Sequence, residues 1–590
     1  MKATIIDLLC TSQPDNIALA EQLCISQGWD IIKIIREFHY HTVAILKPAD
    51  FLRNFCYVVE KSNHYTFPDK YPDAVYSMNL TNSNLSKLPQ TWPANLTQLF
   101  ISNNNISEFP PNLPDKLQYL TLDRNRISQI PSYLPANLIS FSFSHNLVKK
   151  LPDVLPDKLI YLVADYNQIG SLPDNLPDKL LQLSCSNNQI AKLPDNLPDS
   201  LEKISCNHNQ ISSLPQRLPS GLKKLGVTNN QIKSLEIHDA PNLEGLQCDN
   251  NQIEQISING APLLRNIGLS NNKLSKLVLE QTPQLSVLDC SYNQITELAL
   301  PKVGAFDYLN CKNNQLVDIP AELLKRLNFL NCADNQLTAL QIPAESRLSY
   351  LKADHNRLQT LGEKIPLGLK YLYVANNELT NLPELNKLLE ELDCAYNQIS
   401  SLPERLPKQL KKLQIQHNQI SHLTGKVGQH FSYLNCSYNQ ITEIPNSMWD
   451  KLEYLYCSHN LIEKLPIHWA SNTHLKRVDC SYNKIEKIGY SQNSGLKYFF
   501  INHNQLTEIP SWLESCVQEL ECRGNLITSI DLSDFKRLEI INCADNRIKF
   551  IPNDLCKTLR KMYVNNNPFY KPVDFSPTFW EKWEGYWVKK

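Results

Sequence analysis

The residues best suited to chemistry in this chain, its thiols and imidazoles, recur at long and regular intervals. Of 17 cysteines, twelve follow a spacing of about 21 residues: Cys185, Cys206, Cys248, Cys290, Cys311, Cys332, Cys394, Cys436, Cys457, Cys480, Cys522 and Cys543. Six of the 14 histidines keep the same period: His145, His208, His355, His417, His459 and His503. Closely spaced thiols and imidazoles would predict a nucleophile or a metal site. Residues about 21 positions apart can meet only if the fold brings them together, so the elements that carry them must be identified first.

A single repeat accounts for this spacing. The pattern LxxLxLxxNxL recurs in 24 units from Val75 to Phe569, with asparagine at the ninth position of every unit except the first, where Ser83 stands. The interval departs from 21 residues only twice, with 20 residues before Asn397 and 23 before Asn483. The cysteines occupy the sixth position, and the histidines share the eighth with tyrosines: Tyr166, Tyr292, Tyr396, Tyr438 and Tyr482.

The repeat predicts a solenoid built on a parallel sheet. Alternating apolar and polar residues at the third to sixth positions indicate a short strand. One repeat is too small to bury its own apolar edge, so neighbouring repeats must stack and pair their strands in parallel. Asparagine amides can satisfy backbone groups at the turn after each strand, which predicts a ladder that includes Asn188, Asn209, Asn251 and Asn293. We interpret the sixth-position cysteines as small buried hydrophobes, with Cys290, Cys311 and Cys332 in successive units.

The segments that return from one strand to the next are rich in proline. Ser171–Lys179 contains two prolines four residues apart, a spacing that excludes a regular helix and favours extended, polyproline-like backbone. The convex side of the solenoid should therefore be mostly irregular.

These motifs resemble those of leucine-rich repeat proteins of the bacterial type. The wording LPxxLPxxLxxLxxxxNxIxxLP in 173–194 is similar to the short proline-rich repeats of secreted bacterial effectors. Residues 285–293, with Cys290 at the sixth position, resemble the cysteine-ladder repeats of internalin-like proteins. The resemblance covers about 75–570 and implies an α/β solenoid of horseshoe form with its parallel sheet on the concave face. This architecture hosts many different partners.

Both ends of the solenoid need caps, because terminal coils expose apolar edges. We expect residues 1–74 to form a helical N-terminal cap, with candidate helices at 15–24 and 50–60. In 571–590, Pro577 favours a helix start, and the sequence predicts an aromatic capping helix with Phe579, Trp580, Trp583 and Trp587 on one face. Self-association through this tail is the alternative.

The positions of the CxD motifs within the repeat argue against ubiquitin-ligase activity. Some bacterial repeat effectors carry a ubiquitin-ligase domain with a CxD motif, and Cys332–Asp334 and Cys543–Asp545 match those letters. Both cysteines fall at the sixth position and should point into the core, and no separate domain follows the repeats in this sequence. The eighth-position histidines are never in consecutive units, which argues against a metal site, and no phosphate-binding glycine loop occurs. We therefore expect no catalytic residue, cofactor or metal.

The third and fifth positions should project from the concave sheet face. Large side chains gather there from the twelfth unit onward. We predict a protein-binding surface formed by Tyr308, Phe329, Tyr350, Tyr371, Tyr373, Glu391, Asp393, Tyr433, Tyr454, Tyr456, Tyr498 and Phe500. Tyrosine is enriched at binding hot spots. The alternative is cross-strand stacking that only stabilises the sheet.

The charge balance limits the classes of partner that this chain could bind. The 58 Lys and Arg balance 59 Asp and Glu, and the basic residues of the face, among them Lys352, Lys412 and Arg477, alternate with acidic ones, which disfavours nucleic acid. The apolar runs are too short for a membrane span. Met1–Cys10, interrupted by Asp7, does not resemble a signal peptide. Numerous thiols favour a reducing compartment, so we expect a cytoplasmic protein or one secreted without a signal peptide.

Three functions remain open at this point. The first is a non-enzymatic scaffold that binds a protein on its concave sheet. The second is a secreted bacterial effector, or a surface-interaction protein, that acts on a host or neighbouring cell. The third is a structural protein that assembles through its end caps.

Overall fold

The computed structural model describes residues 75–304, 306–423, 427–449, 451–465, 472–489, 495–551, 554–568, 580–583 and 586–589. The helical cap expected in 1–74 lies outside the described residues. The chain divides into two compact units, the first ending at Phe306 and the second beginning at Asp307.

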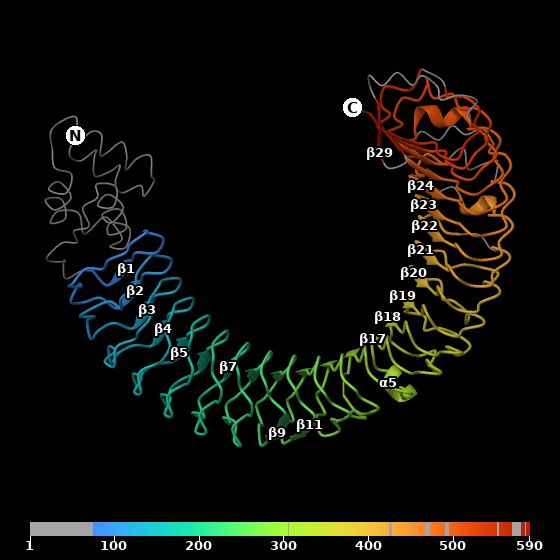
Figure 1. Cartoon of the computed structure of the whole chain (residues 1–590). Coiled ribbons are helices and arrows are strands. Elements are labelled where there is room, and N and C mark those ends of the chain that lie inside the picture. Colours follow the sequence, from blue (N-terminus) through green and yellow to red (C-terminus); the bar gives the residue numbers. More distant parts are fainter. Residues whose placement is uncertain are drawn as a thin grey trace, which may run out of the picture. The chain divides into compact units, whose positions relative to one another are not determined.

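The first unit is a stack of short parallel strands, one for each repeat (Figure 1). Its main strands are β1 (Ser77–Asn79), β2 (Gln98–Phe100), β3 (Tyr119–Thr121), β4 (Ser140–Ser142), β5 (Tyr161–Val163), β6 (Gln182–Ser184), β7 (Lys203–Ser205), β8 (Lys224–Gly226), β10 (Gly245–Gln247), β12 (Asn266–Gly268) and β14 (Val287–Asp289). Each residue pairs with the one 21 positions later, as Leu183 of β6 pairs with Ile204 of β7. The strands therefore occupy the third to fifth repeat positions, as the alternating pattern predicts.

The second unit repeats this arrangement, with its strands on the inner side of its own curve (Figure 1). The strands are β16 (Tyr308–Asn310), β17 (Phe329–Asn331), β18 (Tyr350–Lys352), β19 (Tyr371–Tyr373), β20 (Glu391–Asp393), β21 (Lys412–Gln414), β22 (Tyr433–Asn435), β23 (Tyr454–Tyr456), β24 (Arg477–Asp479), β25 (Tyr498–Phe500), β26 (Glu519–Glu521), β27 (Ile540–Asn542) and β28 (Lys561–Tyr563). The middle residue of every strand is buried, whereas its two neighbours face the inner side of the sheet.

The core follows from the first, fourth, sixth and eleventh positions of the repeat. In the repeat that contains β6, Leu180, Leu183, Cys185 and Ile190 all have no exposed surface. Burial of these side chains from each repeat against the next provides the main driving force for stacking.

Fourteen described cysteines are buried and carry thiols rather than disulfides. Burial raises the pKa of the Cys436 and Cys543 thiols to about 12, because desolvation disfavours the thiolate. These residues therefore act as core side chains and not as nucleophiles.

The convex side is mostly irregular, as the prolines predict. A turn recurs in which the first-position leucine donates to the carbonyl oxygen of a proline three residues earlier, as in Leu180 N to Pro177 O at 3.0 Å. Helical turns appear where a single proline precedes a less constrained segment: α5 (Ala321–Leu324), η1 (Asn446–Met448) and η3 (Ser511–Ser515).

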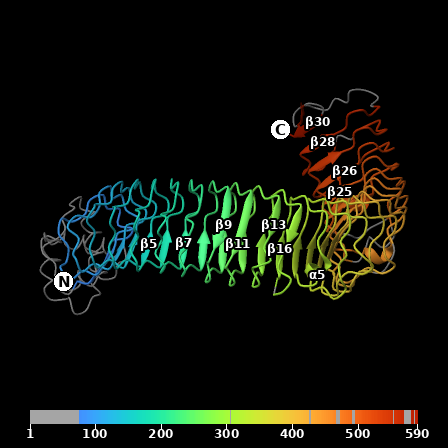
Figure 2. The ribbon, with the colours of Figure 1, turned by 90° about the horizontal axis from the view of Figure 1, so that it is seen from below.

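Two small parallel sheets on the return segments of the first unit depart from the irregular convex side that we predicted (Figure 2). β9 (Ser234–His238) pairs with β11 (Gln255–Asn259), and β13 (Lys276–Val278) pairs with β15 (Glu297–Ala299). The returns at this point lack the paired prolines, so their backbone N–H groups are available for a ladder.

The ninth-position asparagines form a continuous ladder between repeats. The Asn209 amide donates to Cys206 O of its own repeat at 3.1 Å and to Cys185 O of the preceding repeat at 3.0 Å. Its carbonyl oxygen accepts from Ile190 N, also of the preceding repeat, at 2.9 Å. Asn188, Asn251 and Asn293 make the equivalent bonds.

The ladder is unchanged where the repeat length varies. Leu379 N still donates to Asn397 Oδ1 at 2.9 Å across the repeat that is shorter by one residue. Ile462 N donates to Asn483 Oδ1 at 3.0 Å across the repeat that is longer by two. The changes in length are therefore taken up in the return segments.

The C-terminal aromatic tail is not the helix that we predicted over 571–590. Its described residues form β29 (Trp580–Trp583) and β30 (Tyr586–Lys589), which pair with each other in antiparallel fashion, and β30 pairs with β28. Aromatic residues favour strands, and the last strand of a sheet offers unpaired backbone groups that a further strand can satisfy. These terms outweigh the helix-start signal at Pro577.

We predict that Asn209→Ala lowers the free energy of unfolding by roughly 3 kcal/mol, because it leaves several buried backbone groups without a partner. The neighbouring change Gln210→Ala is the control, since Gln210 is exposed. Urea unfolding followed by circular dichroism measures both. Equal midpoints for the two variants would contradict the stabilising role of the ladder.

Candidate functional site

The candidate site is the inner sheet face of the second unit, where the third-position and fifth-position side chains of β16 to β25 lie. We call it the aromatic face and define it by ten rings: Tyr308, Phe329, Tyr350, Tyr371, Tyr373, Tyr433, Tyr454, Tyr456, Tyr498 and Phe500. The parallel register sets the third-position residues of consecutive strands side by side, as Phe329 pairs with Tyr350. The sequence pattern therefore places every predicted ring on one surface.

The rings of this face stack on one another across the strands. The Tyr308 and Phe329 ring centroids are 4.4 Å apart with planes within 7°, and those of Phe329 and Tyr350 are 4.6 Å apart. Tyr350 also contacts the tilted rings of Tyr371 and Tyr373 at 5.9 and 5.6 Å. All of these side chains are half-buried rather than fully exposed. The stacking alternative is therefore present, and it coexists with a surface that still meets solvent.

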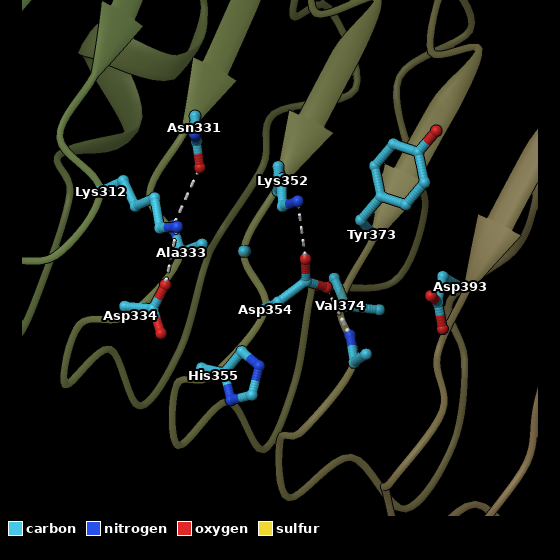
Figure 3. A network of polar contacts seen from close by, with 12 residues as sticks. Lys312, Asn331, Ala333, Asp334, Lys352, Asp354, His355, Tyr373, Val374 and Asp393 are labelled. Atoms are coloured by element: carbon cyan, nitrogen blue, oxygen red, sulfur yellow. Dashed lines mark hydrogen bonds and ion pairs between the residues drawn. The ribbon is translucent and has the colours of Figure 1, made fainter. Parts of the chain in front are cut away.

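A network of polar side chains lies beside the rings on β18 to β20 (Figure 3). Lys352 Nζ lies 3.7 Å from Asp354 Oδ2, and Asp354 also accepts from Ala375 N at 2.8 Å. Tyr373 Oη donates to Glu391 Oε2 at 2.7 Å. Asp393 accepts from Gln414 Nε2 at 2.6 Å. Glu391 and Asp393, the two acidic residues of the predicted binding surface, are therefore both hydrogen-bonded within the chain.

Burial changes the protonation of this network. Desolvation raises the pKa of Asp393 to about 6; the N–H of Ala395 opposes the rise and the carboxylate of Asp354 adds to it. Desolvation also raises the pKa of Asp354, against the N–H of Ala375. The negative charge of the face therefore decreases as the pH falls below neutrality.

A second cluster of rings surrounds one cation on β23 to β25. The guanidinium carbon of Arg477 lies 4.4 Å from the centroid of the Phe500 ring, 5.6 Å from that of Tyr498 and 5.8 Å from that of Tyr456. From sequence alone, Arg477 is only one of several charged residues on this face. The sequence signal that could have predicted this cluster is the position of β24 between two strands that carry aromatic residues. Third-position and fifth-position residues of adjacent strands are neighbours.

The first unit offers no comparable surface at the same repeat positions. Its inner face carries mainly small or polar residues, such as Ser140 and Ser142 of β4, and Gly226, Gly245 and Gly268 on β8, β10 and β12. Since backbone and register are the same in both units, the aromatic face is a property of sequence and not a requirement of the fold.

The eighth-position rings form a separate column beside the sheet of the second unit. Tyr396, His417, Tyr438, His459, Tyr482 and His503 stack in that order, with consecutive centroids 4.0 to 4.4 Å apart. Each of these residues has a positive φ of 52 to 56°. Desolvation lowers the pKa of His417 and of His459, so stacking favours neutral imidazoles. Within the described part of the chain, no group of three His, Cys, Asp or Glu could hold a metal ion.

The comparisons with known proteins agree with this architecture. A family model described as Leucine Rich Repeat matches residues 95–115. The fold is that of a leucine-rich repeat solenoid. A search of curated protein sequences finds no significant match.

Three solved leucine-rich repeat structures illustrate the similarity. YopM from Yersinia enterocolitica WA-314 is 28% identical, with a TM-score of 0.61 over 80% of this chain and 93% of that one. The structure of PEPR1–AtPEP1 is 21% identical, with a TM-score of 0.56 over 85% of this chain and 84% of that one. The plant peptide hormone receptor RGFR1 in complex with RGF2 is 21% identical, with a TM-score of 0.51 over 80% and 88%. The last two show the fold alone.

The fold is typical of protein-protein interaction and of non-enzymatic binding scaffolds. Among its described helices, none has the length and apolar character that a membrane span requires.

We predict a pH-dependent effect of Asp393→Asn on stability. Because the pKa of Asp393 lies above its ordinary value of 3.8, this residue favours the folded state below pH 4, and that contribution is lost as the pH rises through about 6. Asparagine removes the desolvated charge, so the stability of the variant relative to wild type should increase from pH 4 to pH 7, by about 2 kcal/mol.

Urea midpoints at pH 4, 5, 6 and 7 measure this effect. Asp157→Asn, at an exposed carboxylate of a return segment, is the control. Parallel pH profiles for wild type and Asp393→Asn would contradict the assignment.

Proposed function

We propose that this solenoid is a non-enzymatic scaffold whose partner protein docks on the aromatic face of its second unit. The observation that carries the proposal is the contrast between the two inner faces. Ten large rings line one of them, whereas serine, glycine and glutamine predominate on the other. Stacking rings are not needed to hold the sheet, since the first unit forms the same sheet without such a row.

The physical properties of the face support a protein ligand. Tyrosine and phenylalanine bury large areas on binding at a low cost in side-chain entropy. Stacking restricts the rings further, so less conformational freedom remains to be lost. The face also mixes cations and anions, with Lys352 and Lys412 beside Asp354 and Asp393, which favours a partner with both signs of charge.

A second candidate function is that of a secreted bacterial effector acting on a host or neighbouring cell. It is supported by the 28% identity to YopM over 80% of this chain and by the LPxxLPxxL wording of its repeats. Under this proposal the protein leaves the cell by a route that does not depend on a signal peptide. Under the first, it acts in the cytoplasm, where its buried thiols stay reduced.

Assembly through the end caps is the weakest of the three hypotheses. β30 pairs with β28 within the chain, so the last repeat strand is not available to a second copy, and only β29 remains as the outer strand of the sheet.

The test is capture of partners by the immobilised chain from lysates of the source organism and of candidate host cells. We expect the double variant Tyr350→Asp with Tyr371→Asp to lose at least ten-fold in captured partner, because it places two charges among stacked rings. The matched control is Tyr119→Asp with Tyr161→Asp, which changes the same repeat position in the first unit, where both rings are exposed.

Equal capture by wild type and by the Tyr350/Tyr371 variant would exclude the aromatic face as the site. A partner found only in host lysate would favour the effector function, whereas one found in the organism's own lysate would favour a cytoplasmic scaffold.

A further inference from the structure

Among the described residues, Arg477 has no acidic partner, in contrast to the cation next to it in sequence and to another arginine two repeats later. On the adjacent position, Lys476 Nζ lies 2.6 Å from Glu453 Oε2, and in a later repeat Arg523 Nε lies 2.5 Å from Asp545 Oδ2. The side chain of Arg477 makes no hydrogen bond or ion pair with any described residue, and its Nε is buried without a hydrogen-bond acceptor.

An acceptor is close in sequence but is used elsewhere. Asp479 lies on the same strand and the same face, yet its Oδ1 accepts from Ser481 N at 3.1 Å. The rings of Tyr456, Tyr498 and Phe500 surround the guanidinium instead. Ring faces stabilise the positive charge, but they do not accept hydrogen bonds from the in-plane N–H groups. Nε is buried without an acceptor, whereas the terminal N–H groups have no acceptor among the described residues and remain available to a ligand.

We propose that Arg477 is the anchor of the aromatic face and binds one carboxylate side chain of the partner protein. This inference rests on the proposed function and specifies its chemistry. A planar guanidinium fits a carboxylate through two parallel hydrogen bonds. The surrounding rings fix its orientation and shield its Nε from water, as the rim of a binding hot spot does.

The neighbouring charges select a single carboxylate. Asp479 lies on β24 with Arg477, and Glu519 and Glu521 lie on the same face two strands away, on β26. A doubly charged phosphate group would be repelled by these three carboxylates more strongly than a singly charged carboxylate. The same residues favour a basic side chain close to the acidic one on the partner. The occupant is therefore a protein surface with an acidic anchor and an adjacent basic residue.

A phage library of random 12-residue peptides, selected on the full-length protein, tests this proposal. We expect the selected peptides to share an Asp or Glu next to a Lys or Arg. Arg477→Gln should weaken their binding 10-fold to 100-fold, and Arg477→Lys should restore only part of it, because an ammonium cannot form the paired hydrogen bonds. Arg560→Gln, at an exposed arginine paired with Glu539, is the control.

A double-mutant cycle connects the two partners. Replacing the shared acidic residue of a peptide with Asn or Gln should cost as much as Arg477→Gln, and the two changes together should cost no more than either alone. A phosphoserine at that position should bind more weakly than Glu. Tighter binding of the phosphopeptide would overturn the preference for a carboxylate.

Stability gives a second readout that separates recognition from a structural role. Arg477→Met removes a buried unpaired donor, so its urea midpoint should equal or exceed that of wild type. A lower midpoint would show that Arg477 serves the sheet instead of a ligand.

The carboxylate anchor at Arg477 and the docking of a partner on the aromatic face can be tested separately. Peptides that lose affinity for the Tyr350/Tyr371 variant but are unaffected by Arg477→Gln would overturn the carboxylate anchor and leave the docking face intact. Peptides unaffected by both variants would overturn both proposals, and so would a library that yields no ligand.

Discussion

The asparagine ladder is the interaction on which the rest of the structure depends. Each ninth-position amide donates to carbonyl groups of its own repeat and of the preceding one, and accepts from an N–H of the preceding repeat, as Asn209 shows. The turn after every strand would otherwise bury backbone groups that neither a helix nor a sheet satisfies. Because the amide links two repeats, it fixes their relative register as well as the turn. The strands then align their third and fifth positions on one surface.

Once the register is fixed, the inner face becomes free to vary. Side chains at the third and fifth positions contribute little to the core, whose residues come from the first, fourth, sixth and eleventh positions. The same backbone accordingly carries a polar, small-residue face in the first unit and an aromatic face in the second. Recognition in this solenoid can therefore change without altering the interactions that stabilise it, which is why the fold alone does not name a partner.

Much of this architecture could be predicted from sequence because the signal repeats. A strand of three residues is too short to recognise alone, but the alternation around Leu183 recurs in every unit and sets both strand and register. What escaped prediction depends on particular neighbours. The pairing of β30 with β28 needed the open edge of a sheet, which the helix-start signal at Pro577 does not reveal. The enclosure of Arg477 needed the orientation of three rings, and spacing gives only their proximity.

The two irregular repeat lengths show where this molecule tolerates change. One repeat is shorter than the others by one residue and another is longer by two. In both, the hydrogen bond from the backbone N–H to the asparagine Oδ1 is kept, at 2.9 and 3.0 Å. The strand and the turn after it therefore keep a constant geometry in every repeat, and the outer loops absorb the differences in repeat length. Adding or removing one whole repeat would lengthen or shorten the inner face by one strand spacing. For the same reason, the outer loops are the natural place to graft a tag, a fluorophore or a foreign loop without disturbing recognition.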